Sequence, residues 1–273
     1  MTQFLEASTG PARVTILGAP LDLTESFRAG TGAAPATIRA LSQSLESYSA
    51  ATGRDLTEIG LVDRGDLALA GLDMHEALQL IGEAVQQAAE DGLVITLGGE
   101  HTVTLGAVRG LRQYLPDLAV LLVDAHLDLL DEYLGVRVGH ATVSRRLLDE
   151  VGHAALLQVG IRSGTKEEFL LARHNLLTNP GLSLSPHARA ALLGRPVYLS
   201  IDIDVLDPAF APGTGYPEPG GPSFVELADL LYSLDGLQIV AADVCEVLPA
   251  LDPAAITSAA AAKLVREIAV LFG

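Results

Sequence analysis

Short apolar runs alternate along this chain with longer segments in which apolar residues recur every three or four positions. The short runs predict strands. The segment from Met74 to Glu90 predicts a helix, because Leu78, Ile81 and Val85 fall on one face. Strands that alternate with helices are typical of a mostly parallel sheet with helices on both faces. Runs that are apolar throughout fit this fold, since both faces of such a sheet are covered.

The predicted elements span most of the chain. Strands are expected at residues 13–17, 56–62, 93–97, 118–123, 156–161, 197–203 and 237–247. Helices are expected at residues 35–48, 74–90, 102–114, 142–151, 166–173, 186–193, 224–234 and 253–271. No internal repeat, low-complexity linker or abrupt change of composition divides the sequence. We therefore predict one α/β domain over residues 1–273.

Composition narrows the class of protein. Hydrophobic residues make up 49% of the chain and aromatic residues only 4%, so a large core must be built from aliphatic side chains. The 17 basic and 34 acidic residues give a formal net charge of −17. Solubility alone can account for this charge, but it also repels nucleic acids and anionic membranes and attracts cations. We expect neither a nucleic acid nor a membrane as a partner.

The sequence also indicates a compartment. Cys245 is the single cysteine, which excludes an intramolecular disulfide bond. The N-terminal sequence MTQFLEASTGPARV lacks the basic and apolar regions of a secretory signal. No apolar run reaches the ~18 residues of a membrane helix. We expect a soluble, cytoplasmic protein.

Acidic and histidine residues gather where three predicted strands end. They are His101, Asp124, His126, Asp128, Asp202 and Asp204. His101 lies beyond the Gly98-Gly99 turn, and the others follow or end the strands at 118–123 and 197–203. Side chains two positions apart in a strand share a face, and the carboxyl ends of parallel strands meet at one edge of the sheet. We therefore expect the six side chains to converge.

Charge favours two divalent ions among these residues. The four aspartates carry four negative charges, which two divalent cations would neutralise. Without metal, the carboxylates would repel one another and raise one another's pKa values. One Asp-x-Asp after a strand is more often a cap or turn, but three such clusters together predict a metal site. Oxygen-rich ligands with some imidazole suit Mn²⁺ better than Zn²⁺, so we predict two Mn²⁺ ions per chain.

Two further residues are expected at the same edge. His140 lies in a loop that leads into a helix and is a candidate general acid for a leaving amine, although a capping or solvent-exposed histidine is an alternative. Glu246 follows an apolar strand and is a candidate partner for a cationic substrate, although it could form an ion pair at the edge.

The motifs that contain these residues resemble those of the ureohydrolase (arginase/agmatinase) family over nearly the whole chain. They are Gly98-Gly-Glu-His101, Asp124-Ala-His-Leu-Asp128, Ser200-Ile-Asp-Ile-Asp-Val-Leu-Asp-Pro208, Phe210-Ala-Pro-Gly-Thr-Gly-Tyr-Pro-Glu-Pro-Gly-Gly221 and Asp243-Val-Cys-Glu246-Val-Leu-Pro249. The resemblance implies a three-layer α/β/α sandwich with a mostly parallel sheet. It also implies a binuclear manganese centre, the hydrolysis of a guanidino group to urea and an amine, and a homotrimer or homohexamer.

The resemblance also implies a role for each residue. One metal would be held by residues similar to the family's first ligand set, namely His101, Asp124, Asp128 and Asp202. The other would be held by Asp124, His126, Asp202 and Asp204, with Asp124 and Asp202 bridging. His140 is similar to the family's proton-shuttle histidine and Glu246 to its guanidinium-binding glutamate. Asp128 is expected to accept a hydrogen bond from the attacking hydroxide, which makes it the third catalytic residue.

Within the family, the chain is similar to agmatinases, which release putrescine and urea from agmatine. Leu130 stands where arginases carry Asn, and the loop Gly160-Ile-Arg-Ser-Gly-Thr165 lacks the acids that arginases carry there. Three residues depart from the family pattern without removing a ligand. Glu100 replaces a frequent Asp, Tyr216 replaces the usual Thr, and Ala34 replaces a frequent Gly. Tyr216 lies in the loop at the mouth, where we expect it to contact the substrate and influence which amine tail is accepted.

The substrate and the reaction have alternatives. N1-aminopropylagmatine, guanidinobutyrate, guanidinopropionate or arginine could replace agmatine. Arg28 and Arg162 lie in rim loops and could bind a carboxylate, although surface ion pairs are the simpler role. A formimino or acetyl-polyamine hydrolase is less favoured, because deacetylases of similar architecture need one Zn²⁺. A non-catalytic regulatory paralogue is also less favoured, because such a protein would be expected to have lost ligands.

Overall fold

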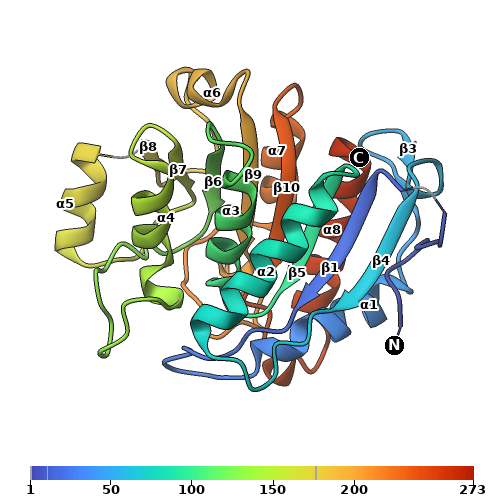
Figure 1. Cartoon of the computed structure of the whole chain (residues 1–273), viewed down its shortest axis with the longest axis horizontal. Coiled ribbons are helices and arrows are strands. Elements are labelled where there is room, and N and C mark those ends of the chain that lie inside the picture. Colours follow the sequence, from blue (N-terminus) through green and yellow to red (C-terminus); the bar gives the residue numbers. More distant parts are fainter. Residues whose placement is uncertain (1, 11, 176) are drawn as a thin grey trace.

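A mostly parallel sheet forms the centre of the protein (Figure 1). The computed structural model describes residues 2–10, 12–175 and 177–273. The strands of the large sheet are β1 (Val14–Ala19), β4 (Leu61–Asp66), β5 (Leu93–Gly98), β6 (Ala119–Val123), β7 (Leu156–Val159), β8 (Leu177–Asn179), β9 (Pro196–Asp202) and β10 (Gln238–Cys245). Their order is β4-β1-β5-β10-β9-β6-β7-β8, and the neighbouring strands pair in parallel. A separate antiparallel pair joins β2 (Tyr48–Ser49) to β3 (Arg54–Asp55).

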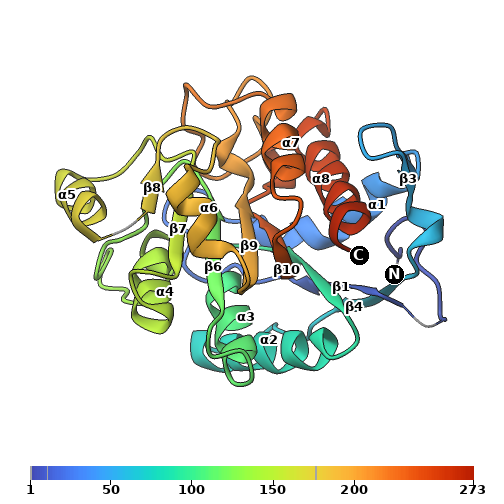
Figure 2. The ribbon, with the colours of Figure 1, turned by 90° about the horizontal axis from the view of Figure 1, so that it is seen from above.

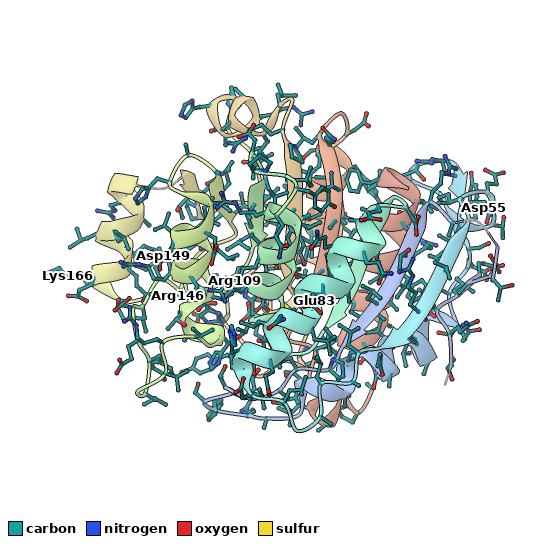
Figure 3. The ribbon with its side chains drawn as sticks, viewed as in Figure 1. Asp55, Glu83, Arg109, Arg146, Asp149 and Lys166 are labelled. Atoms are coloured by element: carbon teal, nitrogen blue, oxygen red, sulfur yellow. The ribbon has the colours of Figure 1, made fainter. Side chains whose placement is uncertain are left out.

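Helices cover both faces of the sheet, as predicted (Figure 2). They are α1 (Ala34–Ser42), α2 (Met74–Ala89), α3 (Val103–Arg112), α4 (Val143–Val151), α5 (Lys166–Asn175), α6 (Pro186–Leu192), α7 (Phe224–Ser233) and α8 (Ile256–Phe272). Helices α2, α3 and α4 lie on one face, and α1, α7 and α8 lie on the other. Charged side chains such as Glu83 of α2 and Asp149 of α4 point outward (Figure 3). The fold is therefore the expected three-layer α/β/α sandwich.

Two apolar clusters fill the spaces between the layers. In β6, Leu121 and Val123 join the cluster beneath α1, α7 and α8, whereas Val120 and Leu122 join the cluster beneath α2 and α3. This division follows from the two-residue period of a strand, which sends successive side chains to opposite faces. An apolar residue at every position of β6 thus anchors helices on both sides.

Helices α2 and α3 approach each other closely because glycines meet at their contact. A Cβ atom on Gly110 would lie 2.1 Å from the carbonyl oxygen of Gly82. Asp73 caps the N-terminus of α2 by accepting a hydrogen bond from the Glu76 amide, and the Glu76 side chain accepts one from the Asp73 amide. The local sequence therefore fixes both where α2 begins and how near it lies to α3.

Two predicted boundaries were wrong by five residues or more, and one strand of the large sheet was missed. The first helix ends at Ser42 rather than near residue 48, and the strand expected at 56–62 is a short 3₁₀ helix (Leu56–Glu58) followed by β4. The short strand β8 was not predicted. The segment after α1 is held by α8, because Arg266 donates hydrogen bonds to the carbonyl oxygens of Glu46 and Tyr48. A contact over such a distance in sequence leaves no local pattern.

The order of the strands brings the ligand-bearing segments together. Strands β10 and β9 lie between β5 and β6, so the carboxyl ends of these four strands are neighbours. Cys245 pairs with Asp202, and Val123 pairs with Ile201, which places Glu246, Asp202 and Asp124 near one level of the sheet. None of the helices in the described part of the chain combines the length and apolar composition of a membrane span.

Candidate active site

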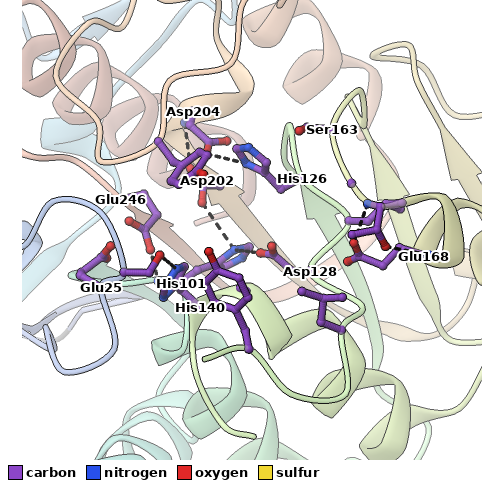
Figure 4. Close-up of a pocket in the computed structure, with 18 residues that line it drawn as sticks. Glu25, His101, His126, Asp128, His140, Ser163, Glu168, Asp202, Asp204 and Glu246 are labelled. Atoms are coloured by element: carbon purple, nitrogen blue, oxygen red, sulfur yellow. Dashed lines mark hydrogen bonds and ion pairs between the residues drawn. The ribbon is translucent and has the colours of Figure 1, made fainter. Parts of the chain in front are cut away.

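Three carboxylates surround one ring nitrogen of His101, and Figure 4 shows two of them, those of Asp128 and Asp202. The Nδ1 atom lies 3.2 Å from Asp124 Oδ2 and 3.5 Å from Asp202 Oδ2. It lies 3.7 Å from Asp128 Oδ2. Both His101 Nδ1 and Asp124 Oδ2 are buried and have no hydrogen-bond partner within the described chain. Their separation and orientation suit donors that share a cation rather than a hydrogen bond.

A second group of donors adjoins the first. His126 Nδ1 lies 2.9 Å from Asp204 Oδ2 and 3.8 Å from Asp124 Oδ1. Asp124 therefore turns one oxygen toward His101 and the other toward His126, as a bridging ligand would. Asp202 lies with the first group, and its Oδ1 accepts a hydrogen bond from the Asp204 amide. The structure brings all six predicted ligands together, and the bridging role of Asp202 stays a prediction.

The electrostatics of the cluster favour bound cations. Burial and the neighbouring Asp204 raise the pKa of Asp202 well above its usual range. Burial raises the pKa of Asp128 to about 7, although the nearby imidazole of His101 opposes this shift. Burial disfavours the charged form of His126, but Asp204 and Asp124 outweigh it and raise its pKa to about 10. Divalent cations would neutralise the four carboxylates, so the donor set fits a binuclear metal centre.

A buried polar network fixes the ring of His101 from behind. Its Nε2 lies 3.0 Å from Ser200 Oγ, and Ser200 Oγ donates to Asp243 Oδ1 at 2.7 Å. Thr104 and Tyr198 both donate to Asp243 Oδ2, at 2.7 and 2.6 Å. Hydrogen bonds of this kind orient a metal-binding imidazole. Sequence reasoning missed Asp243, although an acid inside an otherwise apolar strand was an available signal.

Two site residues have left-handed backbone conformations. Asp128 has φ 50° and Glu246 has φ 64°, a region that side chains other than glycine rarely adopt. The Glu246 amide donates to the Gly99 carbonyl oxygen, and the Asp128 carbonyl oxygen accepts from the Arg145 amide. The surrounding fold thus maintains conformations that cost free energy, which is common where function fixes a side chain.

Glu100 anchors the loop between β1 and α1 over the site. This buried carboxylate accepts hydrogen bonds from the Leu23 and Thr24 amides at 2.5 and 2.7 Å. It also accepts from the hydroxyls of Thr24 and Thr102 at 2.7 and 2.6 Å. Glu100, which stands where the family frequently has Asp, therefore holds the loop through hydrogen bonds. It does not belong to the two donor groups around His101 and His126.

The same loop holds His140, which lies in a short 3₁₀ helix (His140–Thr142) before α4. His140 Nδ1 is 3.3 Å from Thr24 Oγ1, and its Nε2 is 3.1 Å from Ser26 Oγ. Burial lowers the pKa of His140, so the neutral imidazole is favoured near neutral pH. Both ring nitrogens contact hydroxyl groups, which can exchange donor and acceptor roles during a proton transfer.

One pocket collects the candidate catalytic groups. Its lining includes His101, His126, Asp128, His140, Asp202, Asp204, Tyr216 and Glu246, together with Glu25 and Glu168, which sequence reasoning missed. Tyr216 is 51% exposed at the mouth, and its ring packs edge-on against those of His126 and Phe27, at centroid distances of 5.6 and 5.7 Å. The expectation that Tyr216 lies at the substrate entrance agrees with this position.

The described pocket lining contains no lysine or arginine. Arg162, the candidate carboxylate-binding residue, instead donates to the carbonyl oxygens of Asp204, Val205 and Glu218. Arg28 stacks over the ring of Phe27 at 4.4 Å. The alternative role of Arg162 as a carboxylate-binding residue was wrong, because its guanidinium is hydrogen-bonded to backbone carbonyl oxygens and does not line the pocket. The pocket is acidic.

Comparisons with known proteins place the chain in a family. The sequence model of the arginase family matches residues 12–271, so the chain belongs to this family. The agmatinase of Bacillus cereus is 40% identical over 263 residues, which cover 94% of this chain and 91% of that protein. The N(1)-aminopropylagmatine ureohydrolase of Thermococcus kodakarensis is 36% identical over 260 residues, which cover 91% of this chain and 88% of that protein.

A solved structure confirms the fold. The agmatine ureohydrolase of Thermoplasma volcanium matches with a TM-score of 0.87 and 33% identity, covering 99% of this chain and 94% of that chain. The predicted resemblance to agmatinase-like ureohydrolases is confirmed by these similarities. The family uses a binuclear metal centre, and the two donor groups around Asp124 are candidates to form it.

Proposed function

We propose that this protein is an agmatinase, which hydrolyses agmatine to putrescine and urea. The protein is a hydrolase of carbon–nitrogen bonds in linear amidines. The observation that carries the proposal is the acidic pocket in which Glu246 and the metal-ligand clusters occur together without a lysine or arginine in the described lining. Agmatine is cationic at both ends, whereas the carboxylate of arginine or guanidinobutyrate would find no positive partner there.

Two Mn²⁺ ions fit the donor set. His101, Asp124, Asp128 and Asp202 would hold one, and Asp124, His126, Asp202 and Asp204 would hold the other. Oxygen donors outnumber nitrogen donors, which favours Mn²⁺ over Zn²⁺. When bound, such ions supply Lewis-acid activation of a water molecule at neutral pH.

Glu246 is the proposed guanidinium-binding residue. Its Oε1 accepts a hydrogen bond from the His101 amide at 2.6 Å, which fixes the carboxylate, and a bound guanidinium would compete with the hydrogen bond that the Glu246 side chain makes with that of Glu25. Charge-assisted hydrogen bonds between a carboxylate and a guanidinium are strong and directional. Glu246 would therefore hold the guanidinium carbon beside the ligand clusters.

Asp128 and His140 would carry out the proton transfers of the reaction. Asp128 would accept a hydrogen bond from the attacking water and orient it toward the guanidinium carbon. As the new carbon–oxygen bond forms, the bond from that carbon to the nitrogen of the aminobutyl chain breaks. The two protons of the water would pass to this nitrogen through Asp128 and the neutral His140, which accepts one proton and relays one, so the nitrogen departs in protonated putrescine and the carbon leaves as urea.

N1-aminopropylagmatine is the second candidate substrate. The half-exposed Tyr216 shows that the pocket opens to solvent, which leaves room for a longer amine tail. The similarity to the enzyme of Thermococcus kodakarensis supports the same possibility. We further propose that the protein acts in the cytoplasm as a homotrimer or homohexamer, which analytical ultracentrifugation would test.

Urea release after metal removal and reloading tests the proposal. The chelated protein is reloaded with Mn²⁺ and assayed with agmatine, N1-aminopropylagmatine, guanidinobutyrate and arginine. The double variant His126→Ala/Asp204→Ala should lose both bound metal and activity, because it removes one donor group. The control His153→Ala/Asp235→Ala removes the same residue types from exposed positions and should retain both. Equal urea release by wild type and the first variant would refute a metal-dependent hydrolase.

A further inference from the structure

A second glutamate faces Glu246 in the pocket. Glu25 comes from the loop between β1 and α1 and not from a strand end, and its side chain hydrogen bonds with that of Glu246. Figure 4 shows the two side chains on the same side of the pocket. A Cβ atom on Gly215 would lie 3.6 Å from Glu25 Oε2 and 3.9 Å from Glu246 Oε2. The absent side chain of Gly215 therefore leaves space beside both carboxyl groups.

The pair lacks positive charge. Neither glutamate forms an ion pair with an arginine or lysine in the described ranges. Burial, together with the nearby charges of Glu100 and Asp22, raises the pKa of Glu25 to about 7, although hydrogen bonding to Glu246 opposes the shift. Two acidic groups that meet in a partly buried pocket favour a cation between them.

The number and arrangement of N–H donors decide which kind of cation fits between the two carboxyl groups. A guanidinium carries five N–H donors on three nitrogens in one plane, whereas an amidinium lacks the third nitrogen. Glu246 has already committed Oε1 to the His101 amide, so a single carboxylate cannot satisfy the whole guanidinium. Besides its hydrogen bond with Glu246, the Glu25 side chain makes one long contact in the described chain, because the hydroxyl of Thr31 lies 3.5 Å from its Oε1.

We propose that Glu25 is a second guanidinium-binding residue, which together with Glu246 selects guanidino substrates over formimino and other amidine substrates. The inference rests on the proposed function, since it assigns the guanidinium to this end of the pocket. It adds a specificity-determining contact from the loop that Glu100 anchors.

The experiment must separate binding by the Glu25 carboxyl group from the effect of displacing the loop that carries Glu25. Its neighbours Thr24 and Ser26 contact His140, so a displaced loop would impair proton transfer as well as binding. Thr31→Val removes the weak contact between the loop and the Glu25 side chain but keeps the carboxyl group. Glu132→Gln removes the same charge from an exposed residue next to Tyr133 of the pocket lining.

Calorimetric binding of two small cations to the Mn²⁺-loaded protein tests the proposal. Methylguanidine presents three nitrogens and acetamidine presents two. The preference of wild type for methylguanidine, expressed as the ratio of the two Kd values, should fall about tenfold in Glu25→Gln, the effect of one lost charge-assisted hydrogen bond. The KM for agmatine should rise by a similar factor while kcat changes less than KM. Glu132→Gln and Thr31→Val should keep the wild-type ratio within about twofold.

Several outcomes would overturn the proposal. An unchanged ratio in Glu25→Gln, equal weakening of both ligands, or the same loss in Thr31→Val would each show that the Glu25 carboxyl does not select the third nitrogen. Glu25→Ala repeats the measurement if the amide variant is poorly folded. If wild type releases no urea from agmatine, the proposed function fails, and the calorimetric ratio still decides the role of Glu25.

Discussion

Replacing Glu100 with alanine should damage both stability and catalysis. The substitution removes four hydrogen bonds, to the amides of Leu23 and Thr24 and the hydroxyls of Thr24 and Thr102. A hydrogen bond to a charged group contributes ~1.5–3 kcal/mol, and bonds that share one acceptor do not add fully. The loop is partly exposed, with Leu23 52% exposed, so water can replace some of them. We expect the free energy of unfolding to fall by about 3 kcal/mol.

Catalysis should fall through His140. Its two ring nitrogens contact Thr24 Oγ1 and Ser26 Oγ, both in the loop that Glu100 anchors. In the proposed mechanism, a misplaced His140 removes part of the ~100-fold or greater contribution of general acid catalysis. We therefore expect kcat to fall by roughly 10- to 100-fold while the content of bound metal stays near that of wild type. Glu100→Gln keeps one acceptor oxygen and should be intermediate.

Unfolding curves and urea release at saturating agmatine measure the two effects separately. Glu76→Ala is the matched control, because Glu76 also accepts a hydrogen bond from a backbone amide but caps α2 at an exposed position. It should lose about 1 kcal/mol of stability without a change in kcat. If Glu100→Ala unfolds within 1 kcal/mol of wild type and keeps kcat within twofold, the anchoring role assigned to Glu100 is wrong.

Three further predictions concern stability. Arg39→Met should cost about 3–5 kcal/mol in a denaturant titration, because Arg39 forms a buried ion pair with Asp63 and a partly exposed one with Asp66, and a loss under 1 kcal/mol would contradict this. Gly110→Ala should lower the Tm, with a cost of about 1–3 kcal/mol, because its Cβ would collide with the backbone of α2; an unchanged Tm would show that the helices separate freely. Glu25 has a folded-state pKa of about 7 against 4.5, so its protonation stabilises the fold below pH 4.5 and this contribution disappears as the pH rises through 7. In the presence of a metal chelator, the Tm of wild type minus the Tm of Glu25→Gln should decrease as the pH rises from 4.5 to 7. A Tm difference that does not change with pH would refute the raised pKa of Glu25.

The clustering of the six predicted ligands could be foreseen because it follows local patterns. An apolar run ends, acids and histidines follow at spacings of two, and parallel strands place such ends at one edge. The sequence immediately around Asp124, His126 and Asp204 was therefore enough to predict where these residues lie. Net charge pointed the same way, toward a cationic substrate, whereas Arg28 and Arg162 in the rim loops left a carboxylate-bearing substrate open.

The loop residues could not be predicted in this way. Glu25 lies in an irregular segment whose path depends on hydrogen bonds to Glu100, which is distant in sequence. The hairpin of β2 and β3 likewise depends on Arg266 of α8. The periodicity of apolar residues predicts which face of a helix or strand packs against the core. It does not predict which side chain, distant in sequence, will hydrogen-bond to a loop and fix its path.

The position of β9 and β10 between β5 and β6 makes the middle of the sheet the last part to be synthesised. A growing chain that has reached β6 already carries His101 and Asp124, but it lacks the strands that belong between their segments. Direct pairing of β5 with β6 would be a kinetic trap, which the later strands would have to displace. High-affinity metal uptake would therefore report that the last two strands have inserted, and truncated chains would fail to acquire it.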